Sequence, residues 1–378
     1  MSGVYIHVPF CKQACHYCDF HFSTQMGTKT RVLKAMKAEF RLRKEELSNQ
    51  EVKTIYFGGG TPSVLFADEI NALIETVRMH FAVDSNAEIT LEANPDDLSL
   101  EKLEELSQSP INRLSIGVQS FFEADLKLMN RAHDAKEALE SIQNAKSYFN
   151  NISIDLIYGI PNATDAQWRE NIATALDLDV PHISSYALTV VPKTALKHFI
   201  EQGVVPPVDD EQAQRQFMIL LETLESNGFM HYETSNFARP GFISKNNSAY
   251  WQGKPYIGIG PSAHSFDGKV RSWNVSNNIK YANALEAGNL PSEKETLSLR
   301  DRYNEYVMTG LRTQWGVSLD RIQNEFGPLY RKYLEEQAEK YIQDHLLFKD
   351  GDNLLATKSG KFLVDGIASD LFMVNLVK

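Results

Sequence analysis

The chain has 378 residues, of which 43% are hydrophobic, and its 49 acidic and 38 basic side chains give a formal net charge of -11. This length suffices for one large domain and a smaller one, while the acidic balance argues against nucleic acid as the main partner. Neither an uninterrupted apolar run of about 18 residues nor a basic segment followed by an apolar one is present. We therefore expect no membrane span, no export and a cytoplasmic location.

Short β-rich runs alternate with helical patterns in the first half of the chain, which predicts βα units around a parallel sheet. We expect strands over residues 4–8, 54–57, 89–92, 113–118, 152–157 and 182–187. Helices are expected over 67–80, 136–148 and 165–175, and the basic run 29–44 is typical of an amphipathic helix. Six such units predict a partial barrel, in which ligands gather at the carboxyl ends of the strands.

The three cysteines of the chain follow the first expected strand as Cys11, Cys15 and Cys18. Three thiolates leave one iron of a four-iron cluster without a protein ligand, and the amino and carboxylate groups of S-adenosylmethionine (SAM) could chelate that iron. Zinc is the alternative, with a histidine as fourth ligand, although the spacing lacks the separated cysteine pairs of zinc modules. The candidate histidines are His7, His16 and His21. A run of free thiols without further cysteines indicates a reducing compartment.

Small or polar residues recur where the later strands end. The run Gly58 to Gly60 allows close approach of the backbone to a ligand. Glu92 ends the third strand, and Asp155 lies inside an apolar run, where an unpaired carboxylate would be costly. Their recurrence at successive strand ends predicts one site beside the cysteines.

Several motifs together resemble the radical SAM family that comprises oxygen-independent coproporphyrinogen III oxidase and HemW. They are YIHVPFC at 5–11 with the two later cysteines, GGGTP at 58–62, GVQS at 117–120 and DLIYGIP at 155–161. The resemblance runs through nearly the whole chain. It implies that the cysteines hold a [4Fe-4S] cluster, that SAM chelates the open iron, and that one-electron reduction cleaves SAM to a 5'-deoxyadenosyl radical.

The resemblance also implies two groups of cofactor-binding residues. The first SAM would be lined by Tyr5, Tyr17, Gly59, Glu92 and the segment around His264. Positions that contact a second SAM in the oxidase are occupied here by Gly60, Thr61, Gln119, Arg131, Asp155 and Ala187.

Two features favour the HemW branch, whose members are haem-binding proteins thought to deliver haem to respiratory enzymes. The oxidase has a fourth cysteine where this chain has Phe20, and it carries a segment before the first strand, whereas Tyr5 here already lies in that strand. Segments 232–238 and 258–265 are also similar to HemW. The expected function is therefore a haem chaperone with a client haemoprotein, an electron donor and peripheral membrane contact through a client. The alternative is radical decarboxylation of coproporphyrinogen III to protoporphyrinogen IX, because most second-SAM positions are retained.

The motif does not supply a histidine ligand for haem, because the family's His-Asn-x-x-Tyr-Trp begins here with Asn246. Imidazole is the usual proximal donor. We expect His264 to replace the absent histidine, with His231 and His7 as further candidates, and Tyr250 and Trp251 to stack on the porphyrin. A structural role for each histidine and a core position for the aromatic pair are the alternatives.

The last part of the chain is expected to be a separate, mainly helical domain over residues 291–378, after a barrel and extension over 1–290. A helix over 300–311, a second helix begun at 317–320 and a hairpin over 346–355 resemble a winged-helix arrangement. Such modules often bind DNA. The acidic turn with Asp350 and Asp352 instead favours a lid or a partner-docking role.

Overall fold

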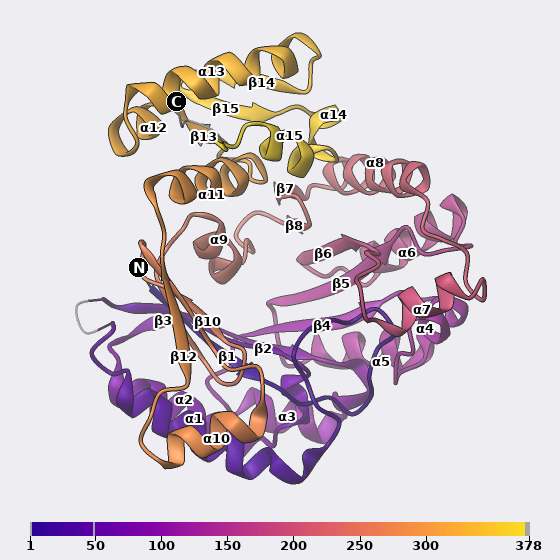
Figure 1. Cartoon of the computed structure of the whole chain (residues 1–378). Coiled ribbons are helices and arrows are strands. Elements are labelled where there is room, and N and C mark those ends of the chain that lie inside the picture. The colour runs from indigo at the N-terminus through magenta and orange to yellow at the C-terminus, as the bar shows by residue number, and fades with distance from the viewer. Residues whose placement is uncertain (1, 48–49, 375–378) are drawn as a thin grey trace.

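The first six strands form the parallel centre of a large sheet, in chain order (Figure 1). The computed structural model describes residues 2–47 and 50–374. The strands are β1 (Ser2–Val8), β2 (Val52–Gly59), β3 (Val83–Ala93), β4 (Arg113–Gln119), β5 (Ile152–Tyr158) and β6 (His182–Ala187). All five neighbouring pairs among them are parallel. The predicted α/β partial barrel of six βα units is confirmed.

Helices cover the outer side of these strands (Figure 1). They include α1 (Lys29–Leu42), α2 (Ala67–His80), α3 (Leu100–Ser107), α4 (Glu123–Leu128), α5 (Ala135–Ala145) and α6 (Asp165–Asp177). The apolar face of α1 is buried through Val32, Met36 and Phe40, as its amphipathic pattern predicts. Helix α2 has the expected bounds, whereas α5 ends three residues before the expected residue 148.

The sheet continues beyond the six predicted strands at both edges, which the sequence did not reveal. Next to β1 lie β9 (Tyr256–Ile259), which is parallel to it, and then β10 (His264–Phe266), β11 (Val270–Asn274) and β12 (Ser292–Thr296), which are antiparallel. Next to β6 lie β8 (Asn236–Ala238) and β7 (Met230–Glu233), preceded by α7 (Ala195–Glu201) and α8 (Asp210–Ser226). These short strands lack a clear period, and their place depends on partners distant in sequence.

The chain between and after these strands adds two helices, α9 (Lys245–Trp251) and α10 (Asn278–Glu286), of which α10 packs on α1. Strand β12 pairs with β11 although it lies after residue 290. The division of the chain at residue 290 stays a prediction.

The C-terminal part has the order of elements of a winged helix. It comprises α11 (Leu299–Leu311), β13 (Val317–Ser318), α12 (Leu319–Glu325), α13 (Pro328–Gln343), β14 (Leu347–Asp350), β15 (Asn353–Ala356), α14 (Lys358–Lys361) and α15 (Val364–Asp370). The Ser318 hydroxyl caps α12 by accepting from the Arg321 N–H at 3.1 Å. A separate apolar cluster around Tyr303, Val307 and Leu334 forms its core. The predicted mainly helical, winged-helix-like unit is confirmed.

The C-terminal unit lies over the edge of the barrel, with α11 above α9 (Figure 1). The Thr234 N–H donates to the Arg312 carbonyl at 2.9 Å, and the Gln314 N–H donates to the Tyr232 carbonyl at 3.0 Å. Main-chain bonds thus join this unit to β7. Over residues 2–47 and 50–374, the helices are all too short or too polar to cross a bilayer.

Candidate functional site

The cysteine segment leaves β1 as a loop that is bonded to the ends of other strands. The Thr61 N–H, just after β2, donates to the Phe10 carbonyl at 2.7 Å, and the His16 N–H donates to the Met129 carbonyl at 3.0 Å. Between the first two cysteines, Lys12 forms an ion pair with Asp96 at 3.0 Å and a second one with Asp97. The loop is therefore held at the carboxyl ends of the strands, where the sequence predicted the site.

Two side chains donate hydrogen bonds to the cysteine sulfurs. Thr61 Oγ1 donates to Cys11 Sγ at 3.3 Å, and Arg131 Nη1 donates to Cys15 Sγ at 3.3 Å. The other end of the Arg131 guanidinium donates to Asn94 Oδ1 and to the Gly117 carbonyl, both at 2.7 Å. A cation fixed beside a sulfur stabilises the thiolate that an iron requires. The resemblance placed Thr61 and Arg131 at a second SAM, and the structure adds this contact with the cysteines.

The donor set fits an iron–sulfur cluster. All three cysteines are free, with Cys11 buried and the other two partly exposed. Burial raises the pKa of Cys11 to about 11 and also raises that of Cys18, so these two thiols are protonated at neutral pH until a metal replaces the proton. Among the described residues no three His, Cys, Asp or Glu side chains are gathered for a single metal ion. A four-iron cluster does not require this, because each thiolate binds a different iron.

The histidines considered as a fourth zinc ligand are engaged elsewhere. The two ring nitrogens of His7 are hydrogen-bonded to the Tyr5 hydroxyl at 3.2 Å and to the His21 carbonyl at 2.9 Å. His16 Nδ1 is 2.9 Å from the Leu128 carbonyl, and His21 Nε2 is 2.9 Å from Asn278 Oδ1.

The glycines at the end of β2 are required first by the protein's own packing. A Cβ at Gly59 would lie 2.6 Å from His7 Nδ1, and φ there is +108°. A Cβ at Gly60 would lie 2.6 Å from the Phe10 carbonyl oxygen. The run therefore lets β2 end close against the start of the cysteine loop, which supplements the ligand-approach argument from sequence.

Two carboxylates lie inside the barrel. The Tyr56 hydroxyl donates to Glu92 Oε1 at 2.7 Å. Burial, together with the charge of Asp155, raises the pKa of Glu92 to about 7. Burial likewise raises the pKa of Asp155 to about 6, against the opposing effect of Arg113. Both groups thus titrate near neutral pH, where a ligand cation would favour their charged forms.

The remaining predicted cofactor positions also lie at strand ends or by the cysteine loop. Gln119 is the last residue of β4, is buried and has φ of +71°. Ala187 ends β6 beside Tyr158. Tyr17 lies within the cysteine loop and packs on a small apolar cluster around Met129 and Leu196.

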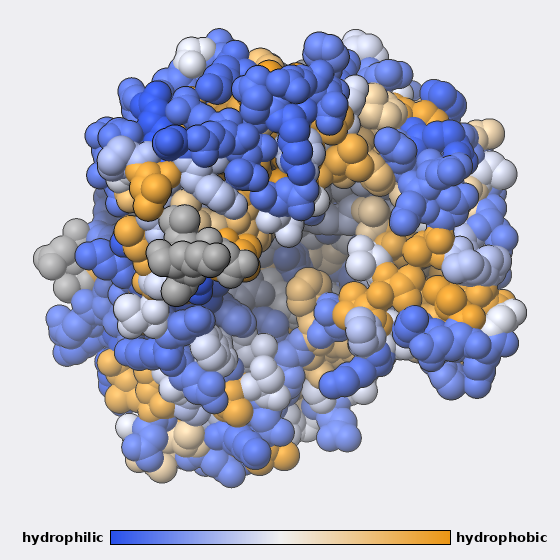
Figure 2. Space-filling model, turned by 45° about the horizontal axis from the view of Figure 1, so that its top comes forward, coloured by the Kyte–Doolittle hydropathy of each residue, from blue (hydrophilic) through white to orange (hydrophobic). Residues whose placement is uncertain are grey.

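A cavity of about 870 Å³ lies between the barrel and the C-terminal unit. Figure 2 shows the face of the molecule hollowed near its centre. The lining includes Asp19, Phe20 and His21 of the cysteine loop and Tyr5 of β1. It also includes Asn246, Tyr250, Trp251, His264, Met308 and Arg312. The cavity therefore brings the predicted haem residues together with Tyr5 of the predicted SAM site.

Of the three candidate haem-binding histidines, only His264 presents an unengaged imidazole among the described residues. His264 lines the cavity at the start of β10, 6.0 Å from the Trp273 ring. Its pKa is lowered by burial and by the charge of Arg271. His231 is buried, stacks on Phe237 at 4.4 Å and has Lys361 Nζ 2.8 Å from its Nδ1. His231 and His7 therefore have structural roles.

Helix α9, which carries the altered motif, is fixed by a buried carboxylate that the sequence analysis missed. Glu88 accepts from the N–H groups of Lys245 at 2.9 Å and Asn246 at 3.0 Å. The Asn246 side chain accepts from Thr54 Oγ1 at 3.2 Å. Glu88 lies on the same face of β3 as Glu92, and apolar residues form the other face. This period of two could have revealed Glu88 as a residue that faces the barrel interior.

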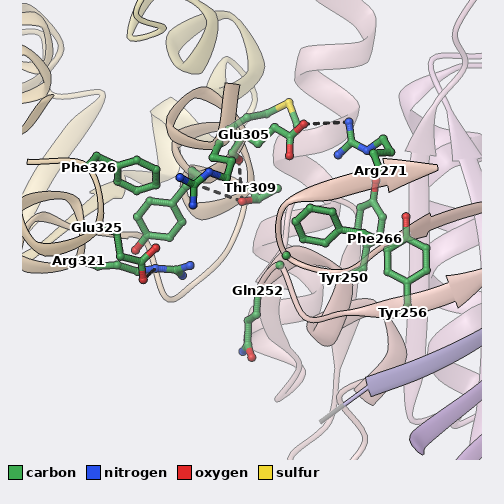
Figure 3. A pocket seen from close by; sticks show the side chains of 15 residues that line it. Tyr250, Gln252, Tyr256, Phe266, Arg271, Glu305, Thr309, Arg321, Glu325 and Phe326 are labelled. Carbon is green, nitrogen blue, oxygen red and sulfur yellow. Dashed lines mark hydrogen bonds and ion pairs between the residues drawn. The ribbon is translucent and has the colours of Figure 1, made fainter. Parts of the chain in front are cut away.

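Two arginines at the boundary with the C-terminal unit were also missed. The Arg312 guanidinium lies 4.8 Å from the Trp251 ring centre and is paired with Glu233 at 3.1 Å and Asp365 at 2.5 Å. Arg271 on β11 is paired with Glu305 on α11 at 2.9 Å. This second pair also borders a neighbouring cavity of about 120 Å³, with Tyr250 and Tyr256 beside it (Figure 3).

Comparison with known proteins agrees with this arrangement. The model of the Radical SAM superfamily matches residues 5–175, and that of the HemN C-terminal domain matches residues 297–363. The solved structure of coproporphyrinogen III oxidase (HemN) from Escherichia coli has the same fold, with a TM-score of 0.85 and 24% identity over 99% of this chain and 90% of that one. The fold and the cysteine site thus define a radical SAM protein, with the [4Fe-4S] cluster and SAM that this class uses.

Relatives that align with nearly the whole chain show to which family of radical SAM proteins it belongs. The chain is 34% identical to "Heme chaperone HemW" of Bacillus subtilis (strain 168), covering 96% of this chain and 97% of the relative. It is 35% identical to the protein of the same name from Mycobacterium tuberculosis (strain ATCC 25618 / H37Rv), covering 98% and 94%. The chain belongs to the HemW family, as the motifs predicted.

Proposed function

We propose that this protein is a haem chaperone, which holds a [4Fe-4S] cluster and SAM at the barrel, binds haem in the large cavity and passes it to a client haemoprotein. The observation that carries the proposal is the cavity itself. Its volume of about 870 Å³ is in the range of sites for large organic ligands. It runs from the residues after the last cysteine to the aromatic and histidine side chains of α9 and β10.

At the cluster end, Cys11, Cys15 and Cys18 are the iron ligands. The cluster with SAM supplies one-electron chemistry when both are bound. Tyr5 and Tyr17 flank the SAM, and Gly59 leaves room for the His7 ring at the end of β2. Burial raises the pKa of Glu92 to about 7, so a positive group on the ligand, such as the SAM sulfonium, would stabilise its charged form.

Three of the positions that resemble a second SAM site serve the cysteine loop instead. Thr61 and Arg131 stabilise the cysteine thiolates that hold the cluster, because each donates a hydrogen bond to a cysteine sulfur at 3.3 Å. Gly60 serves the close approach of β2 to the cysteine loop. Gln119, Asp155 and Ala187 line the strand ends, and a second SAM there stays a prediction.

In the same cavity, His264 binds the haem iron. An imidazole must be neutral to coordinate a metal, and the lowered pKa of His264 keeps it neutral at physiological pH. Tyr250 and Trp251 flank the porphyrin face, with Arg312 fixing the Trp251 ring at 4.8 Å. The C-terminal unit acts as a lid, because Met308 and Arg312 from it line the cavity.

In the cell, we expect a cytoplasmic protein that takes electrons from a donor and meets its client at the membrane surface. A membrane contact through the client requires no spanning segment in this chain. The acidic net charge of -11 gives no support to a nucleic-acid partner.

The proposal is tested by anaerobic haem titration of the reconstituted protein, followed by the Soret band. The wild type should bind one haem, and His264→Ala should weaken binding and change the Soret position because the axial ligand is lost. His80→Ala, at a partly exposed position at the end of α2, is the matched control and should behave as the wild type. Absence of haem binding would overturn the proposal, and an unchanged spectrum for His264→Ala would overturn the ligand assignment.

A further inference from the structure

The ion pair between Arg271 and Glu305 is placed where a ligand in the large cavity can reach it. Arg271 Nη1 lies 2.9 Å from Glu305 Oε1, and the two side chains are 35% and 27% exposed. Both residues line the large cavity and the smaller one beside it. Figure 3 shows the pair joining β11 to α11, so it is also a contact between the barrel and the C-terminal unit.

The other cations of the cavity wall differ from Arg271 in how they are neutralised. Arg312 is paired with two carboxylates, Glu233 and Asp365. Lys254 lines the cavity, is exposed, and forms no ion pair with the described residues. Arg271 has a single carboxylate partner, which comes from the other structural unit.

Glu305 is a partner that can be exchanged. Its pKa is raised, first of all by burial, so its charged form is poorly solvated where it stands. A guanidinium binds a carboxylate of any origin with the same geometry. A carboxylate from a bound ligand would therefore compete with Glu305 for Arg271.

The surroundings of Arg271 suit a flat aromatic ligand with carboxylate arms. Tyr250, Tyr256 and Phe266 lie around the pair (Figure 3). Arg271 lies opposite Phe266 on the hairpin that places His264 opposite Trp273. One hairpin thus offers an imidazole and a guanidinium to the same cavity.

We propose that Arg271 binds a propionate of the porphyrin, with the propionate replacing Glu305 on the guanidinium and Lys254 assisting. This inference rests on the proposed haem-binding function and names the carboxylate recognition of that site. The exchange also removes the ion pair between β11 and α11, so loading of the cavity is coupled to the hold on the C-terminal unit.

The test compares a porphyrin that has free carboxylates with one that does not. Haem and haem dimethyl ester are titrated into full-length wild type, Arg271→Gln and Glu305→Gln. Arg271→Gln should weaken haem binding about tenfold or more, the range of a charged hydrogen bond, and leave the ester unaffected. Glu305→Gln should tighten haem binding and leave the ester unaffected, because the competing carboxylate is gone.

A matched control is Arg78→Gln, which breaks a surface pair with Glu75 of the same 2.9 Å length and should change neither affinity. Arg271→Lys keeps the charge and should recover part of the haem affinity if Arg271→Gln folds poorly. The inference is overturned if both porphyrins respond equally to Arg271→Gln, or if neither responds while haem still binds. Failure of the wild type to bind either porphyrin would instead sink the proposed function.

Discussion

The two ends of the large cavity are built differently. The cysteine end comes from one contiguous loop, bonded through its main chain to strand ends and with the sulfurs of Cys11 and Cys15 contacted by Thr61 and Arg131. The part of the lining that carries His264 and Arg271 is assembled from four separate elements, α9, β10, β11 and α11, spread over residues 245–311. A compact cysteine motif is thus combined with a proposed haem site whose lining comes from several secondary-structure elements.

The arginines of the two regions differ in the partners that neutralise them. Arg131 is held by carbonyl-type oxygens and a sulfur, with no carboxylate among its hydrogen-bond partners, so its positive charge remains available to the cluster. Arg271 is neutralised by a carboxylate across the boundary between the two units, and Arg312 by one carboxylate across it and one from its own unit. The cysteine end is therefore preorganised, whereas the cargo end can exchange partners.

The largest effect is expected at the cysteine end. Cys15→Ala should abolish the visible iron–sulfur absorption after reconstitution, because two thiolates rarely retain a four-iron cluster. The far-UV circular dichroism should stay that of the wild type, since Cys15 is only partly buried. A variant that kept the full iron–sulfur spectrum would contradict the ligand assignment.

The next effect concerns SAM binding and pH. The pKa of Glu92 in the free protein is about 7, so its carboxylate is increasingly charged as the pH rises through that value. SAM affinity should therefore rise between about pH 6 and about pH 8, as measured by calorimetry with the reconstituted protein. Glu92→Gln should bind SAM weakly at every pH, whereas Glu101→Gln, on the exposed face of α3, should keep the wild-type profile. A rising profile in Glu92→Gln would show that another group is responsible.

Arg131 should change the reduction potential of the cluster without removing it. Loss of a positive charge and of an N–H donor to Cys15 should lower the potential in Arg131→Gln, because hydrogen bonds to the sulfurs and local charge set it. Arg131→Lys should lie in between. The potential is read by an EPR-monitored redox titration, with exposed Arg169→Gln as control. An identical potential in Arg131→Gln would mean that the contact at 3.3 Å has no electronic role.

The smallest effect is expected at α9. Glu88→Gln replaces a charged cap of the α9 N-terminus by a neutral one and should cost about 1 kcal/mol of unfolding free energy. Haem affinity should fall a few fold, because α9 carries Tyr250 and Trp251. Urea unfolding and a Soret titration measure the two effects. The control variant is Glu75→Gln, at an exposed position of α2. Lower stability with unchanged haem affinity would separate α9 from the haem site.

Features that depend on local sequence could be predicted, whereas features that depend on partners distant in the chain could not. The six parallel strands follow from short β-rich runs that alternate with helical patterns, and the cysteine site follows from local spacing. Strand β12 reads Ser-Glu-Lys-Glu-Thr and is largely exposed, so only its pairing with β11 makes it a strand. Glu88 was detectable from its alternation with apolar residues. Arg271 and Arg312 were not, because each has a carboxylate partner in another structural unit, Glu305 for Arg271 and Glu233 for Arg312.

The most direct test of the account offers the reconstituted protein, SAM and reductant either haem or coproporphyrinogen III, anaerobically and in separate samples. The account predicts stoichiometric haem binding in the first sample and unchanged coproporphyrinogen III in the second. Formation of protoporphyrinogen with release of carbon dioxide would contradict it, because the cavity would then serve a decarboxylase rather than a carrier of haem.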